Sequence, residues 1–376
     1  MLTYLIFFVL AGYILLMVVA LAGLSRAFSE REVCGHDFYP GRITVVVPFR
    51  NEVATLPKLI GDLLLQDDKD FEVILVDDHS DDGSMEMVNA MIGSHSHFRY
   101  LKSDGQGKKA ALTTGIHAAT GSLILTTDAD CRSGRKWISV YRRAFADENI
   151  MMAFGLVRTS ENGGRFASLQ SQEFMSVIGA GVAAFGLGKP LYCNGANLAF
   201  RKSAFTEVGG YNSHKNIASG DDEFLLKEMA TYFPGAIRFV READALITTQ
   251  PLRTVGAFVQ QRVRWAGKWR KTPGWISKLV APMMVLVQLA VLGGVCLAAI
   301  EPGGRAVLVF LLASKAGMEY LVVLTVAQAV SLRARYIDFV ILQLLYPFYV
   351  LTIALLSTRG FAWKARRYSP SGALPG

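Results

Sequence analysis

Closely spaced aspartates are the first residues along this chain whose types and spacing could do chemistry. Asp128 and Asp130 form a D-x-D pair directly after the apolar run 122–127. Across a tight turn this spacing brings both carboxylates near one point, which suits a hard divalent ion that bridges to phosphates, with water at its remaining positions. A D-x-D pair alone is a common pattern, but a second acidic strand end in the same chain strengthens the hypothesis of a metal site.

That second strand end is Asp77-Asp78, which follows the apolar run 71–76. Aspartate is a poor strand former, so a carboxylate here either ends the strand and begins a turn or holds a cation. Residues 80–83 are Ser-Asp-Asp-Gly, which favours the turn. Both interpretations stay open for this pair.

A glycine-rich segment, Gly105-Gln-Gly107-Lys-Lys-Ala110, fits the G-x-G-x-x-A dinucleotide fingerprint by spacing. That fingerprint normally belongs to the first strand–helix turn of its domain. Here the strand that leads into the segment, 98–101, is preceded by two other predicted strands. The nicotinamide or flavin interpretation is therefore disfavoured. We expect instead that Lys108 or Lys109, at a helix N-terminus, faces anionic phosphates.

A third acidic group, Asp221-Asp222-Glu223, opens a predicted helix. The helix dipole favours acidic residues there, so capping alone accounts for two of the three, and a catalytic carboxylate remains the alternative.

Further on, Gln261-Arg-Val-Arg-Trp265 lies in a basic stretch, residues 253–278, that has no acidic residue and three interleaved tryptophans, Trp265, Trp269 and Trp275. Such a stretch fits a helix at a membrane surface. It also fits a clamp on a pyrophosphate.

The elements that must position these groups alternate along the chain. Short apolar runs predict strands over residues 43–47, 71–76, 98–101 and 122–127, and apolar spacing predicts helices over 56–65, 85–92 and 108–119. This order indicates an α/β domain with a mainly parallel sheet. Ligands bind just beyond the carboxyl ends of such strands, where both acidic strand ends lie.

The composition adds a membrane part. Of the 376 residues 52% are hydrophobic and 19% are charged, which excludes a disordered chain and disfavours a purely soluble enzyme. The excess of hydrophobic residues lies in four apolar runs long enough to span a membrane, residues 2–24, 279–300, 306–330 and 336–357. A fifth, Gly-rich stretch, 174–188, is too short to span and is expected in the core or at an interface.

The first run is either a cleaved signal peptide or an anchor. No Lys or Arg precedes it, whereas Arg26 and Arg31 follow, so we expect an uncleaved anchor with the following domain in the cytoplasm. The predicted organisation is an anchor over 1–28, a catalytic domain over 29–278 that ends in a basic interfacial helix, and a membrane cluster with a basic tail over 279–376. We expect a multi-pass protein of a bacterial inner membrane.

Four full spans would put the basic tail on the side opposite the domain, against the positive-inside tendency. We therefore expect that one segment does not cross. The candidates are the third, with Lys315 and Glu319 one helical turn apart, and the fourth, with Pro347. The charged pair is either a self-neutralising structural pair or part of an acceptor path.

The net charge of +8 hints at an anionic partner, but the basic residues concentrate beside the apolar runs, where anionic lipid explains them. We expect membrane lipids and no nucleic acid as partners. The cysteines, Cys34, Cys131, Cys193 and Cys296, are scattered and are expected to be reduced.

Taken together, the motifs resemble those of the membrane-integrated family 2 glycosyltransferases, a group that includes cellulose, chitin, hyaluronan and poly-N-acetylglucosamine synthases and ceramide glucosyltransferases. The resemblance runs through seven elements in the family's order: Pro48-Phe-Arg-Asn-Glu52, Val76-Asp-Asp78 with Asp82-Gly-Ser84, Gly107-Lys108, Asp128-Ala-Asp130, Asn194-Gly-Ala-Asn197, Gly220-Asp-Asp222 and Gln261-x-x-Arg-Trp265. It implies a glycosyltransferase-A-type nucleotide-binding domain joined to transmembrane helices.

The resemblance also implies roles, with a UDP-sugar the usual donor. Asp128 and Asp130 would hold Mg²⁺ or Mn²⁺ against the diphosphate, and Asp222, beside Asp221, would be the general base. The residues implied to bind the nucleotide-sugar are Pro48, Arg50, Glu52, Asp77, Asp78, Lys108 and Asp128. Those implied to act near the diphosphate or the acceptor are Gln261, Arg264, Trp265, Asn194, Gly195 and Asn197.

One base and no nucleophilic side chain imply a single displacement with inversion. The tail, residues 360–368, resembles an ending seen in enzymes that act on lipid acceptors and in some small synthases. Three C-terminal segments are few for a long polymer tunnel, so we favour a lipid or lipid-linked acceptor over the alternative, a growing polysaccharide. A nucleotidyltransferase would not need the membrane cluster, and a non-catalytic scaffold would not be expected to keep every acidic position.

Overall fold

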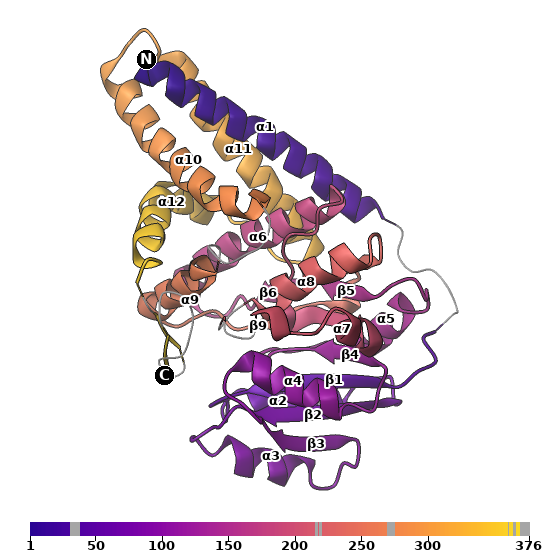
Figure 1. Ribbon diagram of the computed structural model, residues 1–376. Helices are drawn as coiled ribbons and strands as arrows, with labels where there is room; N and C mark the ends of the chain where they lie inside the picture. The colour runs from indigo at the N-terminus through magenta and orange to yellow at the C-terminus, as the bar shows by residue number, and fades with distance from the viewer. Residues whose placement is uncertain are drawn as a thin grey trace.

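The computed structural model describes residues 1–30, 38–214, 217, 220–268, 275–359, 361–363 and 366–368. It has two parts, an α/β domain and a group of long helices that stands above it (Figure 1). The chain comes from the helical part through α1 (Leu2–Ser29) and returns to it after α9 (Val255–Gly267). The two parts are therefore joined at two places in the chain.

The central sheet of the domain has seven strands in the order β3-β2-β1-β4-β7-β5-β8. β7 runs antiparallel to β4 and β5, and the other neighbouring pairs are parallel, which confirms the mainly parallel sheet. The strands are β1 (Ile43–Phe49), β2 (Phe71–Asp77), β3 (Phe98–Lys102), β4 (Leu123–Thr126), β5 (Met152–Gly155), β7 (Leu198–Arg201) and β8 (Ile237–Val240). β1 and β2 are buried along their whole length, as central parallel strands are.

Strand β1 is longer than the sequence predicted, because it continues through Pro48 to Phe49. β4 pairs with β1 only as far as Val46, whereas β2 pairs with it as far as Phe49. Pro48 thus lies where β1 has a single neighbouring strand, and its missing N–H is tolerated there.

The predicted helices are confirmed within a residue or two at each end as α2 (Leu56–Leu64), α3 (Ser84–Ile92) and α4 (Lys108–Ala118). The domain also contains α5 (Trp137–Ala144), α7 (Lys202–Glu207) and α8 (Asp221–Tyr232). A second, small sheet pairs β6 (Val157–Thr159) with β9 (Ile247–Thr249) in parallel.

A layer of helices lies between the sheet and the long helices. Its main member, α6 (Gly164–Gly186), contains most of the Gly-rich stretch and packs against α1, α11 and α12. Two glycines allow α1 and α6 to touch along their backbones, since a Cβ on Gly186 would lie 1.9 Å from the carbonyl oxygen of Gly23. The sequence left a core or an interfacial place open for this stretch. In the structure Phe174, Met175 and Ile178 are buried in the hydrophobic core, while the helix also packs against the long helices.

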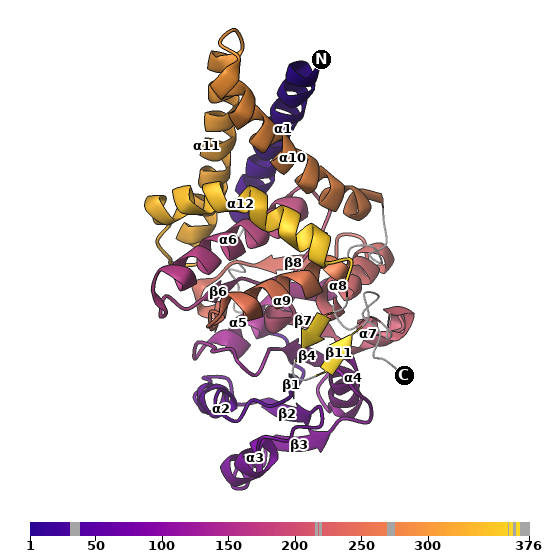
Figure 2. The ribbon, with the colours of Figure 1, turned by 90° about the vertical axis from the view of Figure 1, so that its left-hand side faces the viewer.

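The helical part contains α1, α10 (Trp275–Ile300), α11 (Arg305–Ala329) and α12 (Tyr336–Leu356). By length and composition, all four contain a stretch that could cross a membrane. α1, α10 and α11 rise together away from the domain, whereas α12 runs across their base, beside α6 and α9 (Figure 2). Near the far end, Thr3 Oγ1 donates to Glu301 Oε2 (3.2 Å).

Lys315 and Glu319 form a closed polar cluster with Gln343 and Tyr13, which we call the bundle cluster. Lys315 Nζ contacts Glu319 Oε2 at 2.8 Å and donates to Gln343 Oε1 at 2.9 Å. Gln343 Nε2 and Tyr13 OH donate to the two oxygens of Glu319 at 2.6 and 2.7 Å. Both carboxylate oxygens thus have partners, which favours the self-neutralising structural pair over an acceptor path.

The remaining predictions concern cysteines and the tail. Cys131 and Cys193 are buried free thiols and Cys296 is an exposed free thiol on α10, while Cys34 lies outside the described residues. The tail forms a short hairpin of β10 (Phe361–Trp363) and β11 (Arg366–Tyr368). Trp269 and the basic residues 270–271 also lie outside the described part of the chain.

Candidate active site

The predicted acidic strand ends lie at one edge of the central sheet. β1, β2 and β4 are parallel neighbours, so Phe49, Asp77 and Thr126 close the same edge, and Asp128 follows two residues after β4. Ligands of open α/β sheets bind at this edge.

Asp77 serves the turn after β2. Its Oδ1 accepts hydrogen bonds from the amide and the hydroxyl of Ser80 (2.9 and 2.6 Å), and its Oδ2 accepts one from Tyr100 OH (3.1 Å). Burial and the charge of Asp77 raise the pKa of Tyr100 to about 12. Asp77 is itself buried, so the structure favours the turn interpretation over contact with the nucleotide.

Asp78 holds the glycine-rich loop, because its Oδ1 accepts a hydrogen bond from Gly107 N (2.9 Å). The Arg50 guanidinium donates to the carbonyl oxygen of Asp78 (2.8 Å) and to that of His79. Glu52 N donates to Ser84 Oγ (3.0 Å). These contacts fasten the turns after β1 and β2 to each other, with Arg50 and Glu52 half-buried.

Pro48, also implied as a nucleotide contact, is buried within β1. Its side chain is therefore part of the sheet that supports the site.

Asp128 and Asp130 have the donor set that a magnesium-like ion uses with a nucleotide. Both are half-buried and follow β4, and the structure has no group of three or more His, Cys, Asp or Glu side chains that could hold a metal within the described residues. Mg²⁺ is usually bound through one or two carboxylates, with substrate phosphates and water as the other ligands. The two aspartates therefore fit an ion that arrives with its diphosphate.

Lys108 connects the pair Asp128 and Asp130 with the acidic start of α8. Its Nζ lies 2.7 Å from Asp128 Oδ1 and 3.1 Å from Asp221 Oδ2. The contacts to these carboxylates raise the pKa of Lys108 well above its usual value although burial lowers it, so the ammonium stays charged. Lys108 thus supplies a fixed positive charge between the D-x-D pair and Asp221.

Asp222, the implied base, is oriented by the backbone. Gly195 N donates to Asp222 Oδ2 (3.1 Å), and Glu223 N donates to Asp222 Oδ1 (2.7 Å). A Cβ on Gly195 would lie 3.1 Å from Asp221 Oδ2 and 3.4 Å from Asp222 Cβ, so a side chain would crowd this junction. The Asn194-Gly195 segment therefore positions the carboxylate of Asp222.

The environments of the two aspartates shift their pKa values in opposite directions. Burial, together with the neighbouring charge of Asp221, raises the pKa of Asp222 although Lys268 opposes this shift. Burial also acts to raise the pKa of Asp221, but Lys108 and Lys109 outweigh it and hold that pKa below its usual value. Such a divergence between adjacent carboxyls is typical of groups with different tasks.

Lys268 is a site residue that belongs to none of the sequence motifs. Its Nζ lies 3.0 Å from Glu223 Oε2 and 4.0 Å from Asp222 Oδ1, and it connects the end of α9 to the start of α8. Glu223 also pairs with Lys227 at 2.8 Å. In the sequence Lys268 is one of several cations in the basic stretch 253–278, and no spacing marks it as different.

The Gln261–Trp265 element lies on α9, whose first turn is capped by Thr254 Oγ1, an acceptor for Ala257 N (3.2 Å). Arg262 faces inward and pairs with both oxygens of Glu173 on α6, while Tyr349 OH on α12 donates to Glu173 Oε1 (3.0 Å). We call Arg262, Glu173 and Tyr349 the α9 clamp. Residues two positions apart point to different sides of a helix, so Arg264 points to a different side of α9 from Arg262. Because the clamp fixes Arg262, it also fixes the side to which Arg264 points.

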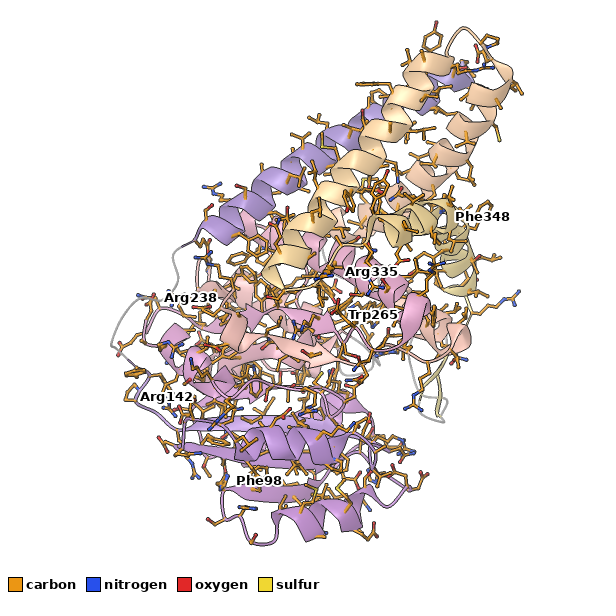
Figure 3. All side chains as sticks on the ribbon, turned by 180° about the vertical axis from the view of Figure 1, so that it is seen from behind. Phe98, Arg142, Arg238, Trp265, Arg335 and Phe348 are labelled. Atoms are coloured by element: carbon orange, nitrogen blue, oxygen red, sulfur yellow. The ribbon has the colours of Figure 1, made fainter. Side chains whose placement is uncertain are left out.

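Aromatic rings complete the clamp. The Arg262 guanidinium lies over the rings of Phe258 and Trp265, at 4.4 and 4.3 Å from their centroids, and also donates to Gln261. Trp265 lies at the junction of the domain and the helical part (Figure 3). Glu173 and Tyr349 were not foreseen, because neither belongs to a sequence pattern that points to α9.

Asn197 does not fit the acceptor contact implied for it. Its side chain has no exposed surface, and it accepts from Trp137 Nε1 (2.9 Å) and donates to the carbonyl oxygens of Leu156 and Ala245 (2.7 and 2.8 Å). Asn197 therefore holds the core beneath the site. Asn194 Oδ1 accepts from Ala196 N (3.0 Å), so that side chain shapes the turn in which Gly195 lies.

Comparison with known proteins agrees with this geometry. Residues 44–209 match the family model described as glycosyl transferase family 2, so the chain contains a family 2 glycosyltransferase domain. Among solved structures it is similar to a mannosyltransferase from Pyrobaculum calidifontis in complex with GDP-Man and Mn²⁺, with a TM-score of 0.56, 17% identity and coverage of 95% of this chain and 98% of that chain. The expected fold class, a glycosyltransferase-A-type domain with added membrane-type helices, is confirmed.

Curated relatives are also glycosyltransferases. The chain is 24% identical over 233 residues to the glycosyltransferase AglE of Haloferax volcanii, covering 59% of this chain and 71% of the relative. It is 35% identical over 96 residues to an undecaprenyl-phosphate 4-deoxy-4-formamido-L-arabinose transferase of Aeromonas hydrophila, covering 24% of this chain and 29% of the relative. It is 31% identical over 109 residues to a cholesterol galactosyltransferase of Borreliella burgdorferi, covering 29% and 30%. The domain and these relatives identify the chain as a glycosyltransferase.

Proposed function

We propose that this glycosyltransferase moves a sugar, with inversion, from a nucleoside-diphosphate sugar to a hydroxyl of a lipid or lipid-linked acceptor at the cytoplasmic face of the membrane. The observation that carries the proposal is the junction of Lys108, Asp221, Asp222 and Gly195. There the half-buried carboxylate of Asp222, whose pKa is raised, lies next to Asp221, which pairs with Lys108, a cation that also contacts Asp128.

The donor's leaving group is the nucleoside diphosphate. Asp128 and Asp130 would hold Mg²⁺ or Mn²⁺ against it, and the ion, when bound, would supply positive charge where negative charge develops. Lys108 adds a charge on the same side, close to Asp128. Arg50 and Glu52, at the joined turns after β1 and β2, are proposed to contact the nucleotide.

The acceptor hydroxyl is a weak nucleophile and needs a positioned carboxylate to take its proton. Asp222 is proposed for this role, because two backbone amides fix its oxygens and burial raises its pKa. The new bond joins the acceptor oxygen to the anomeric carbon while the bond to the phosphate oxygen breaks. The proton passes to Asp222, and a single displacement inverts the anomeric centre.

A lipid-type acceptor is supported by two observations. α6 and α9, which flank the site, also pack against the long apolar helices, so the site lies beside the membrane part. Two of the relatives are named for undecaprenyl-phosphate and for cholesterol. A processive polysaccharide synthase is the second candidate, since the Gln261–Trp265 element is typical of such enzymes.

The test is to incubate membranes that contain the protein with radiolabelled UDP- and GDP-linked sugars and Mn²⁺. We expect label in organic-extractable lipid. Label in insoluble polymer would replace the proposed acceptor with a glycan, and no transfer from any donor would overturn the proposed function. Asp222→Asn should abolish the signal, whereas the matched change Asp244→Asn, at an exposed surface pair with Lys136, should keep it.

A further inference from the structure

The helix α12 is long and apolar enough to cross a membrane, yet polar contacts near its start and beyond its middle hold it to α6, on the side of the catalytic domain, while Gln343 between them contacts the bundle cluster. At its start, Asp338 Oδ2 accepts from Ser168 Oγ on α6 (2.6 Å), and the carbonyl oxygen of Arg335 accepts from Gln172 Nε2 (2.8 Å). Further along, Tyr349 OH donates to Glu173 Oε1, again on α6 (3.0 Å). α12 is therefore fastened to α6 near its first turn and again beyond its middle.

The chain after α12 also stays near the domain, since strand β10 packs against α9. A helix of 21 residues is about 31 Å long, close to the thickness of the hydrocarbon core of a bilayer. If α12 crossed the membrane, its end would lie a full bilayer away from its start. Contacts with α6 at the start and with α9 after the end are incompatible with that.

The two faces of α12 differ in chemistry. Large apolar side chains are exposed on the outer face: Ile337, Val340, Leu344, Leu345, Phe348 and Leu355. The inner face presents Asp338, Gln343 and Tyr349 to α6 and to the bundle cluster. Figure 3 shows Phe348 at the outer edge of the molecule, away from Trp265 at the junction with the domain. This outer apolar face suits contact with the acyl chains of lipid, and the contacts of α12 with α6 at its start and of the following chain with α9 decide how the helix lies.

The charges agree. Arg333 and Arg335 before α12 and Arg359 after it are exposed. With α12 as a span they would lie on opposite sides of the bilayer, whereas with α12 in the plane they lie on one side, as the positive-inside tendency requires. Three spans, α1, α10 and α11, then bring the chain back to the side of the catalytic domain.

We propose that α12 lies in the interfacial layer of the leaflet nearest the catalytic domain, with its apolar face among the acyl chains of that leaflet, and that the C-terminal tail stays on the domain's side. The occupant of the exposed face is membrane lipid. This inference concerns the arrangement in the membrane and does not depend on the transfer reaction, so the two can fail separately.

The test uses the full chain in sealed membrane vesicles and a membrane-impermeant maleimide, in a background with Cys34 and Cys296 replaced by serine. Thr358→Cys, just after α12, is compared with Ser94→Cys on the catalytic domain and Pro302→Cys in the turn between α10 and α11, all at exposed positions. We expect Thr358→Cys to label in the same vesicle orientation as Ser94→Cys and opposite to Pro302→Cys. Labelling together with Pro302→Cys would overturn the proposal.

A depth measurement gives a second, independent readout. A fluorophore attached in turn at Ile337→Cys, Leu344→Cys and Leu355→Cys is quenched by lipids that carry nitroxides at different depths. An in-plane helix gives the same shallow depth at all three positions. A spanning helix would place the middle position deepest, which would contradict the proposal. The matched control is the same lipid with its nitroxide reduced to the hydroxylamine, which does not quench.

Discussion

Two clusters of charged side chains lie in different parts of this molecule, and they are built on different plans. The bundle cluster is closed, with both oxygens of Glu319 bound by neighbours and Lys315 nearly inaccessible. In the cluster around Lys108, the carboxylate of Asp128 is 35% exposed and that of Asp222 is 17% exposed. Charges that satisfy one another hold helices in place, whereas carboxylates with an open side can receive a substrate.

The strongest test of this difference is Asp222→Asn. Loss of a general base typically costs 10²- to 10⁴-fold, so we expect transfer to fall by about 10³-fold. Stabilisation of the protein by Mn²⁺ with UDP or GDP, measured as a thermal shift, should persist. A folded variant that transfers sugar at the normal rate would exclude Asp222 as the base.

The second test changes one lysine in each cluster. Lys108→Met should lower transfer by about 10²-fold and abolish the thermal shift caused by Mn²⁺ and nucleotide, because it removes a charge beside the diphosphate. Lys315→Met should lower the free energy of unfolding by about 1–3 kcal/mol, since Gln343 and Tyr13 still donate to Glu319, and should leave the nucleotide-dependent shift intact. The reverse pattern would contradict the assignment of the two clusters.

A third test uses pH. Asp222 must be deprotonated to act as a base, and burial raises its pKa, so kcat/KM should fall as the pH drops through that raised pKa. Lys268 opposes the shift, so Lys268→Met should move this acidic limb to higher pH, and Lys268→Arg should restore it. An unchanged limb in Lys268→Met would show that another group controls the acidic side of the profile.

The smallest expected effect is that of Tyr349→Phe in the α9 clamp. It removes one hydrogen bond to Glu173, which Arg262 still holds through both oxygens, so we expect a loss of about 1 kcal/mol in stability and less than about threefold in transfer. Tyr336→Phe, at an exposed ring on the same helix, is the matched control. A large loss of transfer with unchanged stability would give Tyr349 a direct part in the reaction.

The sequence predicted the parts of the fold that local patterns encode. The apolar runs of β1 to β4 and the helices between them were found, and the D-x-D pair lies at the sheet edge where parallel strands place it. Pro48 shows the limit of a local rule, since a proline ended the predicted strand while the pairing with β2 continues past it.

Contacts between distant segments were beyond the sequence. Asp77 and Asn197 belong to motifs, but only their neighbours, Ser80, Tyr100 and Trp137, show that their side chains are used to build the fold. Lys268 and Glu173 belong to no motif that pointed to the site, and burial and pairing with partners far along the chain give them their roles. α12 resembles α10 in composition and differs in what its few polar residues bind.

The crossing of α1 and α6 has a consequence for the choice of substrate. Because Gly23 and Gly186 meet with no side chain between them, the backbones of α1 and α6 touch, and this contact holds the two helices close together. If α1 spans the membrane, as we propose, this contact helps to set the height of Asp222 above the bilayer. Under the proposed function, an acceptor would have to bring its own hydroxyl to that height, so the length of its head group would act as a criterion of selection.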